Sequence, residues 1–235
     1  MEKWRKLIHA KNGFTLVELV VVVVILLVIT VSAVPGFMRS LRNGRFEKSI
    51  VDIVSLLDQA RTQALASKLD SGNKIPSGGY GVFFDMTDGV TNQQVVLFID
   101  DWNATANADV NVDYANLTVG SRVLPDGIYT PGEDTVLSTL AVNSSSYIQL
   151  KELRGHRLDG SVWASAPGNT ITVIFKPPYA DTIVVGNNPN PPTSVSLQNF
   201  DAVFELATDD VTRTIKFNRV TTAPQVIKTE APSPS

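Results

Sequence analysis

The sequence predicts an α+β protein, in which one long N-terminal helix precedes a domain of antiparallel strands. Two observations predict this class. A helical pattern runs from Phe14 to about Ser67, and residues 80–220 contain strand-sized runs of β-branched and aromatic side chains separated by Pro and Gly clusters. No comparable helical pattern recurs after the first. Helix and strands are therefore segregated along the chain, as in an α+β fold.

Composition narrows the classes of function. The chain has 235 residues, 43% hydrophobic and 18% charged side chains, a formal net charge of -3 and no cysteine, which fits one domain with an appendage. Lack of cysteine excludes disulfides, thiolate metal sites and a cysteine nucleophile, and the two histidines leave little room for a histidine-based metal centre or triad. Residues 49–235 carry 12 Lys and Arg against 20 Asp and Glu, so no nucleic-acid partner is predicted.

The N-terminus combines a basic leader with an apolar segment. Residues 1–13 contain four basic side chains and one acidic side chain, namely Lys3, Arg5, Lys6 and Lys11 against Glu2. As a helix, residues 14–34 would span about 31 Å, enough to cross the roughly 30 Å hydrocarbon core of a bilayer. A positive leader stays in the cytoplasm. We therefore expect residues 1–13 to be a cytoplasmic leader peptide, residues 14–34 to cross the membrane once, and the rest of the chain to lie outside the cytoplasm.

Two ordinary explanations of this apolar segment fit poorly. A secretory signal peptide has a shorter apolar region followed by a cleavage site of small residues, and residues 31–34 are only a weak candidate for such a site. A plain membrane anchor does not explain Glu18, because an unpaired carboxylate in lipid costs about 2.5 to 3.5 kcal/mol. Glu18 therefore indicates a functional role in which its charge has a partner.

Between the leader and the aliphatic run stands the motif Gly13-Phe14-Thr15-Leu16-Val17-Glu18. It resembles the class III signal of type IV pilin-like proteins, which include pilins and the pseudopilins of type II secretion and competence. The resemblance implies that prepilin peptidase cleaves between Gly13 and Phe14 and methylates the new amine of Phe14. It also implies that Glu18 pairs with the N-terminal amine of a neighbouring subunit in a filament. Pro35 stands where many family members have a helix-softening proline.

The resemblance has further implications for fold, partners and location. It implies a pilin-like fold and a non-enzymatic subunit without a cofactor. Its partners would be other pilin or pseudopilin subunits, prepilin peptidase, an inner-membrane assembly platform and, before assembly, membrane lipid. The protein would reside in the inner membrane and later in an extracellular or periplasmic filament.

Two short stretches, residues 56–66 and 79–84, resemble the GspH/FimT group of minor pilins and type II secretion pseudopilins. They favour a minor subunit of a type IV pilus or of a type II secretion pseudopilus. A major pilin is the alternative within the family. A binding domain on an uncleaved anchor is the alternative outside it.

The helix is predicted to continue over residues 35–69 as an amphipathic segment. Pro35 removes one helical hydrogen bond, so a kink or local melting is expected between Val31 and Gly44. Basic residues spaced by three then form an edge that faces solvent or lipid headgroups or, alternatively, the acidic surface of a neighbouring subunit. These are Arg39, Arg42, Arg45 and Lys48. An apolar stripe predicts core packing rather than a cofactor site. Its residues are Ile50, Val54, Leu57, Ala60 and Ala64.

Residues 70–222 are predicted to form the β-rich globular domain. The runs with strand composition are Tyr80–Phe84, Val95–Ile99, Tyr147–Lys151, Thr170–Phe175, Thr182–Val185, Val195–Leu197, Ala202–Leu206 and Thr212–Phe217. Residues 223–235 contain three prolines and no periodicity, so they are predicted to be a flexible tail.

An oxygen-rich segment is the best candidate for a binding site in this domain. Calcium favours several oxygen ligands, and the residues that could supply them are Asp100, Asp101, Asp109, Asn111 and Asp113. The spacing departs from that of an EF-hand, and the alternation with valines also fits a half-exposed strand or a solvated loop. No metal or cofactor is therefore predicted, and calcium is the alternative. His156 is expected at the surface or in a turn.

Overall fold

The computed structural model describes residues 15–69, 75–76, 78–86, 93–100, 129, 131, 134–142, 148–164, 168–189, 192–207 and 211–229. The chain divides into two compact units, Met1–Arg45 and Phe46–Ser235. The described residues contain one helix, α1, and eleven strands, β1 to β11. A long N-terminal helix and antiparallel sheets confirm the predicted α+β, pilin-like class.

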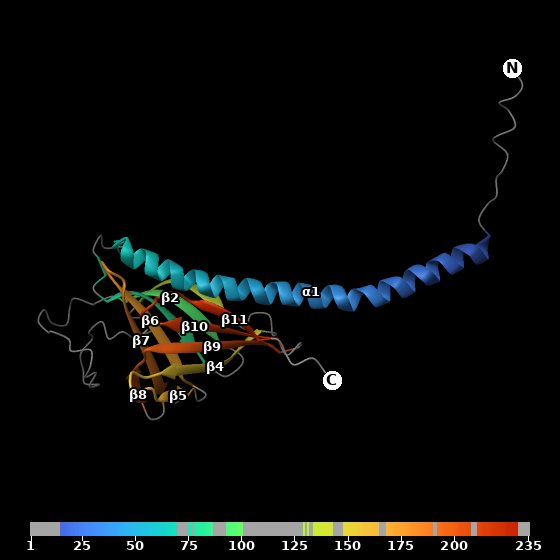
Figure 1. Ribbon diagram of the computed structural model, residues 1–235. Coiled ribbons are helices and arrows are strands. Elements are labelled where there is room, and N and C mark those ends of the chain that lie inside the picture. The colour runs from blue at the N-terminus through green and yellow to red at the C-terminus, as the bar shows by residue number, and fades with distance from the viewer. Residues whose placement is uncertain are drawn as a thin grey trace, which may run out of the picture. The chain divides into compact units, whose positions relative to one another are not determined.

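Helix α1 runs from Leu16 to Leu65 and is continuous through Pro35 (Figure 1). The local melting expected between Val31 and Gly44 is therefore wrong. Proline holds φ near a helical value, and the hydrogen bond that it removes is the one to the carbonyl of Val31. The loss of one hydrogen bond leaves the rest of the ladder in place.

The first sheet has six strands in the order β3-β2-β1-β6-β7-β8, and every neighbouring pair is antiparallel. Its strands are β1 (Gly79–Asp85), β2 (Gln94–Asp100), β3 (Thr135–Ala141), β6 (Thr170–Lys176), β7 (Asp181–Pro189) and β8 (Pro192–Ser196). In the centre of this sheet, Tyr80 lies opposite Ile99 on one side and Phe175 on the other.

The second sheet has five antiparallel strands in the order β11-β10-β9-β4-β5. Its strands are β4 (Ile148–His156), β5 (Val162–Ala164), β9 (Asn199–Leu206), β10 (Val211–Asn218) and β11 (Gln225–Thr229). Strand β9 alternates half-buried and buried side chains along its whole length. Since successive side chains of a strand point to opposite faces, one face of this sheet covers the core and the other meets solvent.

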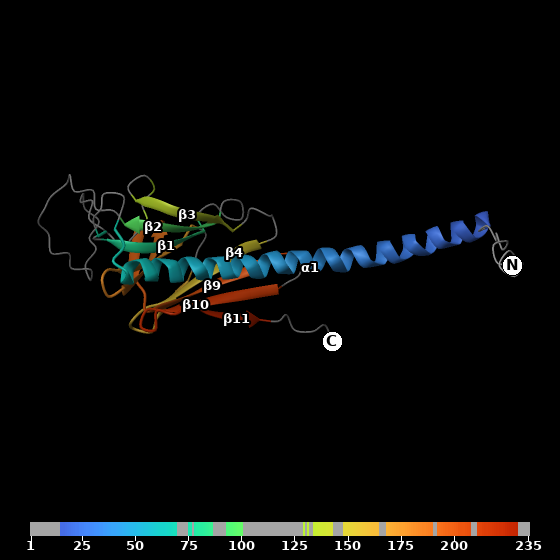
Figure 2. The same ribbon diagram turned by 90° about the horizontal axis from the view of Figure 1, so that it is seen from above.

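The core lies where the second half of α1 meets the two sheets (Figure 2). The buried helix residues include Phe46, Ile50, Ile53, Leu57 and Ala60. They share one cluster with the inner faces of both sheets, where aromatic rings meet at centroid distances of 5.3 to 6.0 Å. These rings are Phe84, Phe175, Phe200 and Phe217. The predicted stripe is confirmed, with Val54 at its partly buried margin.

Gln93 joins the two sheets through a pair of buried hydrogen bonds. Its Nε2 donates to the Leu150 carbonyl at 2.8 Å, and the Leu150 N–H donates to its Oε1 at 2.6 Å. The amide side chain thus acts as a hydrogen-bond partner for both backbone groups of Leu150 in β4. A buried amide with both of its groups bonded avoids the cost of an unsatisfied polar group.

The opposite face of the six-stranded sheet carries a second, smaller apolar cluster. Phe83, Val96, Phe98 and Ile174 are buried there, and the ring of Tyr129 packs on it, 4.9 Å from Phe83 and 5.1 Å from Phe98. Gly81 lies opposite Phe98 in the register. A Cβ at Gly81 would come within 2.4 Å of the Phe98 ring, so only glycine fits this position.

Each of the eight predicted runs overlaps a strand, although Tyr147 lies outside the described residues and Leu197 follows the end of β8. Three strands were not predicted. These are β3, β5 and β11. Residues 225–229, assigned to the flexible tail, pair with β10 instead, so that part of the tail prediction is wrong. The apolar residues of β11 are only Val226 and Ile227, and the strand exists because β10 supplies its hydrogen-bond partner. Such tertiary pairing leaves little trace in local composition.

Candidate functional site

The first part of α1, residues 15–38, has an exposed apolar surface on all sides, and this surface is called the sleeve below. Each of residues 15–38 is exposed, and the large apolar side chains range from 46% exposed at Val22 to 80% exposed at Leu16. The apolar side chains surround the helix on all sides rather than along one stripe. A helix with this pattern belongs in a membrane or inside a larger assembly, and this one is long and apolar enough to cross a membrane.

Thr15 caps the start of the helix. The Glu18 N–H donates to Thr15 Oγ1 at 3.3 Å, and the Leu19 N–H donates to the Thr15 carbonyl at 3.2 Å. Glu18 thus occupies the third helical position, in the first turn, where a negative charge is favourable beside the positive end of the helix dipole. The cap was not predicted, although the Thr-x-x-Glu spacing is the sequence signal of a capping box.

Glu18 is the only charged residue between Thr15 and Met38. The hydroxyls in this part of the helix are bonded to the backbone: Thr30 donates to the Leu26 carbonyl at 2.7 Å and Ser32 to the Ile29 carbonyl at 2.9 Å. Such bonds lower the cost of placing a hydroxyl in lipid. Glu18 is therefore the one group in the sleeve whose burial in an apolar medium requires a partner for its charge.

The N-terminal segment was compared with known proteins. Residues 8–34 match the family model of the prokaryotic N-terminal methylation motif. This match supports a type IV pilin-like protein. It includes Gly13, Phe14 and Glu18, and it points to a structural, membrane-anchored subunit. Gly13 and Phe14 lie outside the residues that the structure describes. Comparison of the chain with curated proteins and with solved structures gave no match.

The basic residues that follow the pilin-like sleeve spiral around the helix. A step of three residues turns an α-helix by about 300°, so Arg39 and Lys48 lie about half a turn apart. Arg39, Arg45 and Lys48 are exposed, whereas Arg42 is half-buried. The four side chains therefore spread over half of the helix circumference rather than along a single line.

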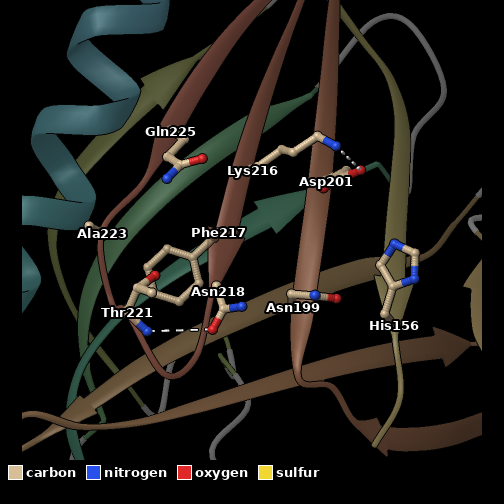
Figure 3. A pocket seen from close by; sticks show the side chains of 9 residues that line it. All are labelled: His156, Asn199, Asp201, Lys216, Phe217, Asn218, Thr221, Ala223 and Gln225. Carbon is tan, nitrogen blue, oxygen red and sulfur yellow. Dashed lines mark hydrogen bonds and ion pairs between the residues drawn. The ribbon is translucent and has the colours of Figure 1, made fainter. Parts of the chain in front are cut away.

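The body has an open polar pocket of about 250 Å³ on the outer face of the five-stranded sheet (Figure 3). It is lined by His156, Asn199, Asp201, Lys216, Phe217, Asn218, Thr221, Ala223 and Gln225. Lys216 Nζ lies 3.6 Å from Asp201 Oδ2, and the Thr221 N–H donates to Asn218 Oδ1 at 3.4 Å. His156 is half-buried at the end of β4, which agrees with the predicted surface position. The pocket combines residues of four adjacent strands, β4, β9, β10 and β11, with residues of the segment that joins β10 to β11.

Asp100 is the one calcium candidate among the described residues. It ends β2, is 3% exposed, and packs so closely on Gly78 that a Cβ there would lie 2.3 Å from its carboxyl carbon. The other candidates (Asp101, Asp109, Asn111 and Asp113) lie outside the described residues. Within the residues that the structure describes, no group of three or more His, Asp or Glu side chains could hold a metal ion.

Among the residues that the structure describes, three titratable groups have shifted pKa values with local causes. The hydroxyl and N–H of Ser161 donate to Asp159 at 2.6 and 2.8 Å and hold the pKa of Asp159 below its usual value. A hydrogen bond to Glu152 raises the pKa of Arg154. Burial, with smaller effects of Asp134 and Asp85, raises the pKa of Tyr129. Each shift follows from a turn, a surface pair or a packed ring, and none marks a catalytic group.

Proposed function

We propose that this chain is a structural subunit, a minor pilin or pseudopilin, of a type IV pilus or a type II secretion pseudopilus. The observation that carries the proposal is the methylation motif at residues 8–34, which leads directly into a helix that is exposed and apolar on all sides. A helix of this kind is stable in lipid before assembly. The same surface can then pack against the helices of other subunits in a filament.

Processing by prepilin peptidase would create the partner that Glu18 requires. Cleavage after Gly13 leaves a cationic amine on Phe14, and the capped helix start presents the Glu18 carboxylate one turn away from that end. In a filament, the carboxylate of one subunit would pair with the amine of the next. A buried pair of this type specifies the register of neighbouring helices more than it adds stability, because desolvation offsets much of the attraction.

The same proposal covers topology, partners and cofactors. The basic leader would remain in the cytoplasm, the apolar segment would cross the inner membrane once, and the β-rich body would lie outside. Assembly would take place with other pilin or pseudopilin subunits on an inner-membrane platform, and no cofactor would be needed. The short stretches at residues 56–66 and 79–84 support a GspH/FimT-like minor subunit rather than a major pilin.

Intact mass spectrometry tests the proposal. The full chain would be produced with and without prepilin peptidase and extracted from membranes. With the peptidase, we expect a chain that begins at a methylated Phe14. A Gly13→Val variant should keep the leader, because a side chain at the cut site hinders entry of the backbone into the protease cleft. If the wild-type chain retains Met1 in the presence of an active peptidase, the protein is a binding domain on an uncleaved anchor instead.

A further inference from the structure

Four strands form the edges of the two sheets in the described part of the chain. They are β3 and β8 in the six-stranded sheet, and β5 and β11 in the five-stranded sheet. An edge strand carries a row of backbone N–H and C=O groups that another extended chain can pair with. Proteins usually protect such edges by short length, proline, charge or a bulge.

Two of the four edges are protected. Strand β5 has only three residues, and β8 begins with Pro192 opposite Pro189, the last residue of β7. Short length and proline both prevent the addition of another strand. Neither edge therefore offers a site for a partner.

Strand β3 is the least protected edge. Its seven residues, Thr135–Ala141, include no charge, proline or glycine, and all are exposed except the half-buried Leu140. Val136 and Leu137 are 44% and 40% exposed. A bulge leaves Leu137 without an opposite residue in β2, but Ser138–Ala141 stays in regular register. This stretch has the properties of a strand that accepts a partner.

Strand β11 is the natural counterpart of β3. It has five residues, of which Gln225–Lys228 are exposed, and its single charge is Lys228. Val226 and Ile227 are 40% and 41% exposed, close to the values for Val136 and Leu137. Since β3 has no charge, no like-charge repulsion opposes pairing of the two strands. Figure 2 shows β3 and β11 on opposite flanks of the body.

We propose that β3 of one copy pairs with β11 of the next copy, so that the sheets of neighbouring bodies become continuous. An interface between two different surfaces of the same chain repeats in one direction and generates an open helical assembly. This inference rests on the proposed function, because helix packing in a filament would hold the bodies of two neighbouring copies side by side. A short strand pair is weak by itself, and it becomes effective when helix packing already holds the bodies close together.

Disulfide cross-linking tests the pairing, since the chain has no cysteine of its own. Two differently tagged full chains, one Ser138→Cys and the other Ile227→Cys, would be co-expressed with prepilin peptidase and oxidised in membranes and filaments. Cross-strand neighbours have Cβ atoms about 4.5–5.5 Å apart, which is near the reach of a disulfide. We expect a mixed dimer linked between positions 138 and 227. Thr139→Cys with Val226→Cys tests the adjacent residue pair of the same antiparallel register.

Ser196 supplies the matched control. It is an exposed serine on β8, the other edge of the same sheet, so Ser196→Cys with Ile227→Cys should give no mixed dimer. Adding Thr139→Lys to the Ser138→Cys chain should abolish the cross-link, whereas adding Ser196→Lys should leave it unchanged. Equal yields at positions 138 and 196, or dimers linked only between two copies of position 138, would overturn the proposal.

The mass of the N-terminus, measured on the same membranes, separates the two proposals. Chains that begin at Phe14 and lack the cross-link would overturn the strand pairing and leave the proposed function intact. Chains that retain Met1 and still form the 138–227 cross-link would support the pairing and overturn the processing. Uncleaved chains without a cross-link would overturn both.

Discussion

The two parts of α1 have similar apolar residues but opposite surroundings. Residues 16–41 are exposed on every side, whereas the segment from Phe46 to Leu65 buries one stripe against the sheets and leaves Val51 and Leu65 outside. The difference lies in the width of the apolar surface. An apolar stripe can be buried by one neighbouring element of the same chain, whereas a helix that is apolar on all sides requires lipid or other subunits to cover it.

Charged groups distinguish the two parts as well. In the second part, Glu47 accepts a hydrogen bond from Arg213 Nε at 2.9 Å and a second one from the Nη2 group of the same residue. In the first part, Glu18 has no ion pair among the described residues. Glutamate thus has two roles in the helix. Glu47 makes a contact within the chain, whereas the charge of Glu18 requires a partner from outside it.

The largest expected effect comes from truncating a buried leucine. Leu57→Ala removes a side chain that is 1% exposed, and a cavity of this kind costs about 2–5 kcal/mol of unfolding free energy. Leu27→Ala, in the sleeve, should leave the stability of the body unchanged because Leu27 is 60% exposed. Denaturant unfolding of both variants in detergent, followed by near-ultraviolet circular dichroism, measures the difference. Similar losses in the two variants would show that the sleeve also packs on the body.

Loss of Glu18 should impair filament assembly and leave the stability of the body unchanged, which is the reverse of the effect of Leu57→Ala. Glu18→Ala leaves the Phe14 amine of the neighbouring subunit without a counter-ion, at a cost of about 2.5–3.5 kcal/mol on insertion scales, so incorporation into filaments should fall by roughly 100-fold. The body should melt as in the wild type. Glu47→Ala is the control, with lower body stability and normal incorporation. Quantitative blots of sheared filaments measure incorporation, and a wild-type level for Glu18→Ala would contradict the assigned pairing.

Much of this contrast could be predicted from sequence. The pattern of residues 14–34 predicted a helix for an apolar medium, and the stripe at Ile50, Leu57 and Ala60 predicted the buried face. Both depend on local periodicity, which a single sequence contains. The capping role of Thr15 could also have been predicted, because Glu18 three positions later completes the sequence signal of a capping box.

Other features depend on contacts between distant residues. Glu47 and Arg213 are 166 positions apart, and nothing in either neighbourhood identifies the partner. Strands β3 and β11 are edge strands, and each receives its hydrogen bonds from a single neighbour, β2 or β10. The pocket around His156 and Asp201 likewise arises only after the strands are placed side by side. Such features follow from topology, which local composition does not determine.

A smaller effect is expected from the Glu47–Arg213 pair. Arg213→Ala removes both hydrogen bonds and the contact of the guanidinium with the Phe46 ring, whose centroid lies 5.9 Å from Arg213 Cζ. Because Glu47 is 38% exposed, solvent screens much of the charge interaction. The cost should be about 1–2 kcal/mol of unfolding free energy. Lys216→Ala, whose partner lies 3.6 Å away at the surface, is the control and should change stability little. A double-mutant cycle with Glu47→Ala isolates the pair, and a coupling energy near zero would contradict it.

The smallest expected effect comes from the two helix glycines, and its sign is opposite to that expected for a strand glycine. Gly36 and Gly44 have no atom within 4 Å of the position that a Cβ would occupy, and alanine stabilises a helix by about 0.5–1 kcal/mol relative to glycine. Gly36→Ala and Gly44→Ala should therefore slow amide hydrogen exchange in the surrounding turns. Gly81→Ala, in β1, should lower the unfolding free energy of the body, because its Cβ would meet the Phe98 ring. Hydrogen-exchange mass spectrometry of the three variants in detergent decides the matter. Faster exchange around Gly36 or Gly44 after substitution would contradict the expected stabilisation of the helix.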